Sequence, residues 1–180
     1  MNPLMIATFI IIILSVLLFY YLNDIYNKVV TLKNYTEKAF ANIDVLLKQR
    51  ADEIPGLLRI TEQAMSHQKA LLLELAELRE HYFASPYINQ KIEINNKITH
   101  VLQNINLLIE NYPHLQALKN LHKLQNRIAS LENKIADRRE FFNESVALYN
   151  TGIQTFPNLI FAKILGYQPR TMLDISITDE

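Results

Sequence analysis

The sequence predicts an all-α protein, in which an N-terminal transmembrane helix is continuous with an antiparallel up-down-up-down helical bundle. Three observations predict this class. An uncharged apolar run opens the chain, apolar residues then recur at spacings of three and four, and no segment alternates with the period of two that strands require. Glycine occurs only three times in 180 residues, and the expected helix breaks fall at prolines. The composition therefore favours a few long helices with short connections.

The N-terminal run, residues 4–22, contains no charged side chain. At 1.5 Å per residue it spans about 28 Å, close to the hydrocarbon core of a bilayer. No basic segment precedes it and no small-x-small cleavage site follows, which favours an uncleaved anchor over a signal peptide. We therefore assign residues 1–22 to a single membrane anchor.

The lysines after the anchor bear on its orientation. Lys28, Lys33 and Lys38 follow the span closely, whereas no Lys or Arg precedes it. The positive-inside rule then favours a cytoplasmic bundle, with the extracytoplasmic orientation as the alternative because Asp24 and Glu37 lie among the lysines. We expect a single-pass protein of a bacterial inner membrane.

Residues 23–167 are expected to form the bundle, with helix ends at prolines. The first helix should run from the anchor to a sharp break at Ile54-Pro55, and the second should run from Pro55, capped by Asp52, to about residue 84. Further prolines predict a third helix over 86–112, a fourth over 113–155, and a short apolar helix from Phe156-Pro157. Gly166 should end the short helix as a left-handed cap, and residues 168–180 are expected to be a loose tail.

Two blocks of sequence resemble the LemA family of bacterial membrane proteins. The first is NYTEKAFANIDVLLKQRADEIPGLL, and the second is LENKIADRREFFNESVALYNTGIQTFPNLIFAKILGY. The resemblance covers nearly the whole chain, with the blocks in the family's order. It implies a membrane-anchored helical bundle, and it implies no agreed reaction.

A cluster of polar residues near the expected break is the first candidate site: Asn42, Asp44, Lys48, Arg50 and Asp52. At the membrane-distal turn these side chains would make a patch for binding a ligand or partner. The alternative is a buried polar network that fixes the register of the helices, and we favour that alternative.

Arg138 and Arg139 form the second candidate. Guanidinium groups suit phosphate, so the pair is a candidate for binding lipid headgroups. The alternative is ion pairing with Glu77 or Glu80 on the second helix.

The short apolar helix is the third candidate, because the fourth helix is expected to run about 17 residues past the level at which the third begins, about 25 Å at the helical rise. A kink, a bundle end that stands clear of the lipid, or contact with the bilayer would each absorb that length. In the hypothesis that follows, Phe156, Ile160, Phe161 and Tyr167 dock at the bilayer interface and Lys163 extends to the headgroups. The alternative is a short helix folded back over the bundle core, and we slightly favour that alternative.

Motifs for catalysis are weak. No Glu-x-x-His pair is present for a di-metal site, and Glu77 with His81 makes no coordination shell by itself. Ser66 and Lys69 match Ser-x-x-Lys but lack the companion motifs of the enzymes that use it.

The function expected from these residues is therefore a membrane-anchored scaffold or interaction protein without catalysis. Neither a cofactor nor a nucleic-acid partner is expected: Lys and Arg total 18 against 18 Asp and Glu, cysteine is absent, and the glycines form no phosphate loop. The expected partners are the lipid bilayer and other membrane proteins, and a homo-oligomer stays open. The alternative is a ligand-binding module or an enzyme that uses the polar cluster.

Overall fold

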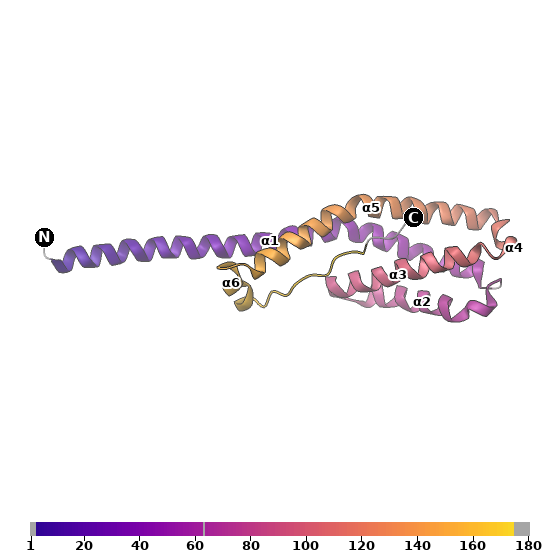
Figure 1. Ribbon diagram of the computed structural model, residues 1–180, viewed down its shortest axis with the longest axis horizontal. Coiled ribbons are helices and arrows are strands. Elements are labelled where there is room, and N and C mark those ends of the chain that lie inside the picture. The colour runs from indigo at the N-terminus through magenta and orange to yellow at the C-terminus, as the bar shows by residue number, and fades with distance from the viewer. Residues whose placement is uncertain (1–2, 63, 175–180) are drawn as a thin grey trace.

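The protein is all-α, as its sequence predicts. The computed structural model describes residues 3–62 and 64–174, and within them it contains helices and no strand. The helices are α1 (Pro3–Thr61), η1 (Ser66–Gln68), α2 (Lys69–Ala84), α3 (Ile88–Ile109), α4 (Pro113–Gln116), α5 (Lys119–Gln154) and α6 (Asn158–Ile164). Figure 1 shows α1, α2, α3 and α5 alternating in direction along the long axis of the molecule, with the first part of α1 projecting alone from the bundle.

Helix α1 is a single helix of 59 residues that joins two environments. Its first part carries an apolar window with a mean hydropathy of 2.6 that no other part of the structure covers, so it is long and apolar enough to cross a membrane. From Ile25 onward one face of the same helix is buried, including Val29, Ile43, Ile54 and Leu57. The apolar segment thus continues into the bundle core without an interruption in its hydrogen-bonded backbone.

The predicted break at Ile54-Pro55 is wrong, because α1 continues through Pro55 to Thr61. A proline inside a helix has no N–H for the carbonyl four residues earlier, which here belongs to Ala51. Arg79 of α2 supplies a replacement, since its Nε donates to the Ala51 oxygen at 3.1 Å. Asp52 is consequently an exposed residue within the helix and not an N-cap.

The chain reverses after Thr61 instead. The Thr61 hydroxyl donates to the Leu57 carbonyl at 2.9 Å, and the Met65 N–H donates to the Thr61 carbonyl at 2.8 Å. The Met65 side chain is fully buried beneath this turn. The second helix therefore begins at Lys69 and not at Pro55, whereas its end at Ala84 is as predicted.

The single helix predicted over 113–155 is wrong at its start, because Leu118 takes an extended backbone (φ −81°, ψ 110°) that separates α4 from α5. Helix α5 is still longer than α3, and its excess length packs on α1 and α6 at the end near the apolar segment. Gly152 permits this approach, because a Cβ there would lie 2.2 Å from the Leu32 Cδ1 atom of α1. The contact forms a second hydrophobic cluster, separate from the main core: Ile25, Val29, Tyr149, Ile153 and Ala162.

Gly166 ends the short apolar helix with a φ of 67°, which confirms the predicted left-handed cap. The expectation of a loose tail is wrong for residues 168–174, which lie along the bundle beside α3 and α5 (Figure 1). Leu173 in this segment is only 3% exposed and belongs to the main core. Residues 175–180 of the predicted tail lie outside the described residues.

Candidate functional site

Arg50 of α1 is the largest fully buried side chain in the protein's described part, with an exposed fraction of 1%. Its Nη1 donates to the Thr99 hydroxyl at 2.9 Å and pairs with the Glu132 carboxylate of α5. Its Nη2 donates to the side-chain and backbone oxygens of Asn95 on α3. This one guanidinium therefore joins α1 to α3 and α5.

Asp44 forms a second polar group two turns earlier on α1. It accepts a hydrogen bond from the Tyr82 hydroxyl at 2.6 Å, and the Lys48 and Lys91 ammonium groups lie at 2.6 Å and 3.7 Å. Burial acts to raise the pKa of the Asp44 carboxyl, but its hydrogen bonds and the lysines outweigh burial and hold that pKa below its ordinary value. Burial, with the bond to Asp44, raises the pKa of the Tyr82 phenol far above its ordinary value, so Tyr82 remains a donor.

The five residues predicted as one patch do not form one. Arg50 and Asp44 are buried in separate networks, while Asn42 and Asp52 are exposed on α1. The location at the membrane-distal turn is also wrong, because α1 extends to Thr61 and the reversal lies beyond the cluster. The buried groups have partners from several helices, an arrangement that fixes helix register. Sequence reasoning missed those partners because Tyr82, Asn95 and Glu132 are remote in the chain.

Arg138 and Arg139 do not pair with Glu77 or Glu80 among the described residues, since α5 packs mainly on α1. The Arg139 Nη1 instead donates to the backbone oxygen of Asp174 at 3.1 Å, and Arg138 is exposed. The pairing expected from the sequence relied on the incorrect position of the first turn. Phosphate binding by this pair stays a prediction.

The residues expected at a bilayer interface divide into two sets. The ring of Phe161 meets that of Tyr26 of α1 edge-on, with 6.4 Å between the ring centroids, and the centroids of the Tyr167 and Tyr149 rings lie 6.5 Å apart. Both Phe161 and Tyr167 therefore face the second cluster. Phe156 and Ile160 are exposed by 81% and 51%, and Lys163 is exposed with them. Ile164, which the sequence hypothesis did not include, joins this apolar face at 74% exposure. Helix α6 thus packs on α1 with one face and presents an apolar face outward.

Four asparagine side chains bind residues 168–174, hereafter the strap, and sequence reasoning missed them. Asn150 and Asn143 of α5 each exchange two hydrogen bonds with one strap residue, Arg170 and Leu173 respectively, at 2.8–2.9 Å. From α3, Asn89 binds the Pro169 oxygen and the Thr171 N–H, and Asn96 binds the Met172 oxygen and the Asp174 N–H. The signal in the sequence was the repeated spacing of seven, 89 with 96 and 143 with 150.

Side chains add two anchors to the strap. Arg170 donates from Nη2 to Glu37 Oε1 of α1 at 2.9 Å and lies over the Tyr149 ring at 5.4 Å. Leu173 enters the main core. The Tyr149 hydroxyl donates to the Gln168 oxygen at 3.0 Å. The strap is therefore held through its backbone along its length and through its side chains at two positions.

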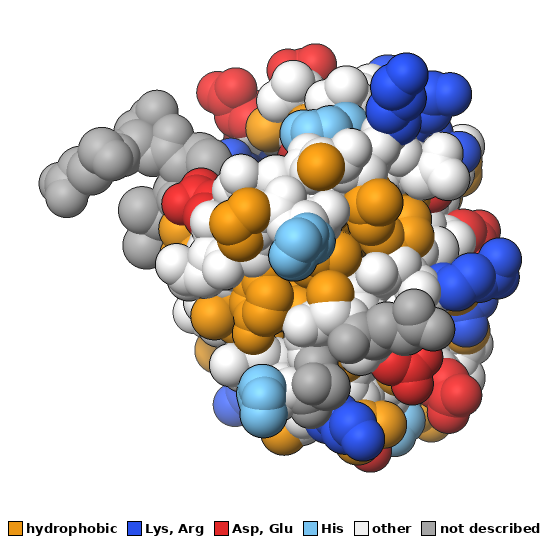
Figure 2. Space-filling model, turned by 90° about the vertical axis from the view of Figure 1, so that its right-hand side faces the viewer, with side chains coloured by type: hydrophobic (Ala, Val, Ile, Leu, Met, Phe, Trp, Pro, Cys, Tyr) orange, Lys and Arg blue, Asp and Glu red, His pale blue; other side chains and the backbone are white. Residues whose placement is uncertain are grey.

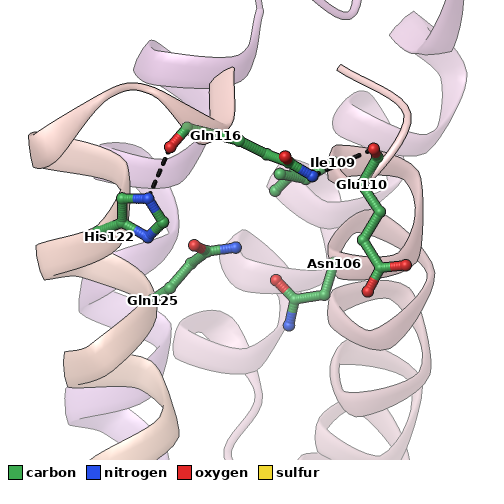
Figure 3. A pocket seen from close by; sticks show the side chains of 6 residues that line it. All are labelled: Asn106, Ile109, Glu110, Gln116, His122 and Gln125. Atoms are coloured by element: carbon green, nitrogen blue, oxygen red, sulfur yellow. Dashed lines mark hydrogen bonds between the residues drawn. The ribbon is translucent and has the colours of Figure 1, made fainter. Parts of the chain in front are cut away.

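The far end of the bundle, opposite the apolar segment, has hydrophobic side chains near its middle and charged ones at its rim (Figure 2). A hollow open to solvent lies at this end between α3, α4 and α5, and Figure 3 shows its lining: Asn106, Ile109, Glu110, Gln116, His122 and Gln125. The His122 Nε2 atom is bound to the Gln116 carbonyl at 2.6 Å, and the Glu110 carboxylate points away from it. The hollow thus brings together no acid–base pair.

Metal-ligating side chains do not gather in the described part of the chain. Across residues 3–62 and 64–174, no group of three His, Asp or Glu residues is placed to hold a metal ion. In the two networks the Arg50 Nη atoms and the Asp44 carboxylate are bound to other residues, whereas the Arg50 Nε atom is buried without a hydrogen-bond partner among the described residues.

Comparison with known proteins agrees with this architecture. A family model described as the LemA family matches residues 39–180. The chain is also similar to the magnetosome protein MamQ of Magnetospirillum gryphiswaldense, with 33% identity over 61 residues. That similarity spans 34% of this chain and only 22% of the length of MamQ. The family match takes in α1 from Ala39 onward and every later helix, and the chain belongs to the LemA family.

Proposed function

We propose that this LemA-family protein is a single-pass, membrane-anchored scaffold or interaction module of a bacterial inner membrane, with its bundle in the cytoplasm and without catalysis. The observation that carries the proposal is the continuity of α1, whose uncovered apolar part leads directly into the buried core. Exposing an apolar surface of this size to water is unfavourable, and the length of the apolar segment matches the thickness of the hydrocarbon core of a bilayer.

The proposal that the protein binds partners without transforming them rests on where its polar groups lie. Arg50 and Asp44 have structural partners from other helices, and the hollow at the far end holds no acid–base pair. Large apolar side chains are instead exposed along the bundle, among them Leu73, Leu107 and Leu148. We propose that partner proteins contact the bundle at one or more of these positions.

Extraction experiments test the anchoring. The double variant Ile11→Arg, Leu14→Arg should release the protein from membranes into carbonate or urea, because each charge is costly at the centre of a bilayer. Val45→Arg is the matched control, since Val45 is an exposed apolar residue of the same helix within the bundle. Anchoring is refuted if the wild-type protein is extracted as readily as the double variant.

Photo-crosslinking in cells tests the interaction role. A photoreactive residue at Leu73, Leu107 or Leu148 should give a discrete adduct at one or more positions, and the fully buried Leu75 should give none. If none of the three exposed positions yields an adduct, the scaffold role is wrong even where the anchoring holds.

A further inference from the structure

We propose that the groove between α3 and α5 is a binding site for extended peptides of the pattern Arg-x-x-Leu, and that the strap is its intramolecular occupant. The ligand in question is a segment of a partner protein that displaces the strap. This inference rests on the proposed interaction function and names the chemistry of the partner.

The first support is the type of contact. A side-chain amide carries a donor and an acceptor side by side, so it can pair with a peptide backbone as another strand would. All four asparagines use both groups on the strap backbone. Such contacts do not depend on the side chains of the bound segment, so they would accept another extended segment equally well.

The second support is a match of spacing. Seven residues of α-helix advance about 10.5 Å, and three extended residues advance about 10 Å. The contacts follow this match on both walls: Asn150 and Asn143 bind residues 170 and 173, while Asn89 and Asn96 bind groups that are also displaced by three residues. The groove is therefore built as a repeating frame for extended backbone.

The third support is that sequence selection is confined to two positions. The Arg170 side chain is 12% exposed against Glu37 and Tyr149, and Leu173 is buried in the core. Of the two residues between them, Thr171 is half-buried and bound only through its backbone N–H, and Met172 is 40% exposed, so these positions make less demand on the residues that occupy them. A competing segment then needs an arginine and, three residues later, an aliphatic side chain.

The covalent attachment of the strap gives it an advantage over a partner segment that competes for the same groove. Because the strap is joined to the bundle through Gly166, it acts at a high effective concentration and lowers the apparent affinity for any peptide added in trans. Weakening the strap's own anchors should raise that affinity while the walls of the groove stay intact. This predicts a specific difference between strap variants and groove variants.

The experiment uses the full chain in detergent and a fluorescent peptide of residues 167–174. Arg170→Glu in the protein places a carboxylate beside Glu37 and should weaken the strap, so the peptide should bind this variant at least about tenfold more tightly than wild type. Adding Asn143→Asp and Asn150→Asp removes two donors to backbone oxygens and should reverse the gain. A peptide carrying R170E and L173S is the matched control and should not bind.

A second measurement follows the strap in an otherwise unaltered groove. The chain has no cysteine, so Met172→Cys accepts one environment-sensitive dye at an exposed strap position. Excess peptide should shift the dye signal towards that of a water-exposed label, and the control peptide should not. This arm holds even if Arg170→Glu lowers the stability of the fold.

Two results would overturn the proposal. If the peptide neither binds the folded Arg170→Glu variant nor moves the dye, the strap is a permanent part of the bundle. If wild-type chains instead form dimers that Leu173→Ser dissociates, the occupant is the strap of a second copy and not a partner segment. Neither result affects the extraction or crosslinking tests, so failure here is distinct from failure of the proposed function.

Discussion

Arg79 donates a hydrogen bond to the Ala51 carbonyl, which receives none from Pro55 because proline has no backbone N–H. This contact lets α1 pass through a proline, and it also ties α2 to α1. The Arg79 guanidinium further lies 5.0 Å from the Phe83 ring and 3.7 Å from Asp52.

The first prediction concerns this substitute hydrogen bond. Arg79→Met should lower the free energy of unfolding by about 1–3 kcal/mol, because it leaves the Ala51 carbonyl without a partner. In a Pro55→Ala background the same change should cost less, since an alanine at this position restores the intrahelical N–H. Urea unfolding of the four chains in a double-mutant cycle measures the difference. Equal costs in both backgrounds would show that Arg79 acts only through its other contacts.

The second prediction concerns the buried ion pair. Glu132→Leu should destabilise the bundle by about 3 kcal/mol, because the charge of Arg50 is left buried without its carboxylate. Adding Arg50→Met should recover most of that loss, since the unpaired charge is then gone. Glu144→Leu on the exposed face of α5 is the control and should change stability by less than about 0.5 kcal/mol. A double variant less stable than the single one would refute this account.

The third prediction concerns pH. Because the folded protein holds the pKa of Asp44 below its ordinary value, this carboxylate stabilises the fold above the ordinary pKa of about 3.9 and loses that contribution as the pH falls through and below it. Asp44→Asn should therefore lower the melting temperature at pH 7. It should also reduce the difference between the melting temperatures at pH 7 and at pH 3. Melting curves of Asp44→Asn and of the exposed Asp137→Asn control measure this. An unchanged difference between the two pH values would count against it.

The fourth prediction concerns orientation. Alkaline phosphatase is active only outside the cytoplasm, so its fusion after Glu180 should be inactive if the lysines after the span set a cytoplasmic bundle. A fluorescent protein at the same position serves as the converse reporter. Strong phosphatase activity would place the bundle on the opposite side.

The fifth prediction concerns the outward face of α6. The chain has no tryptophan, so Phe156→Trp gives a single fluorophore on that face, and Phe83→Trp on α2 is a matched aromatic control away from it. In liposomes that contain the full chain, brominated lipids should quench the fluorescence of the Phe156→Trp variant and not that of the Phe83→Trp variant. If bromination quenches the Phe156→Trp fluorescence no more than that of the Phe83→Trp control, α6 does not lie at the bilayer interface and only covers the bundle core.

The apolar pattern predicted the helices well, because burial on one face imposes spacings of three and four wherever a helix packs. It failed at Pro55, since the residue that compensates for the proline, Arg79, lies on another helix. Proline signals at Tyr112-Pro113 and Phe156-Pro157 did coincide with helix starts, because a proline in the first turn of a helix displaces no intrahelical hydrogen bond.

The sites were less predictable than the helices. Arg50 stands among charged residues in the sequence, and only the fold brings Asn95 and Glu132 to it. The prediction of a loose tail failed for the strap because its sequence is not helical and its partners are backbone-binding asparagines. Contacts made through the backbone leave little trace in the sequence of the bound segment.

The continuity of α1 has a mechanical consequence. About 39 residues of the helix lie beyond the apolar run, a rigid arm of about 58 Å at the helical rise. A tilt change of about 10° of the segment in the bilayer would swing the far end by roughly 10 Å. Because α1 is itself a wall of the core, rotation of the segment about its axis would turn the same residues that pack on α5. The position and orientation of the bundle would therefore follow the tilt and rotation of the apolar segment, as they would not if a flexible linker joined the two.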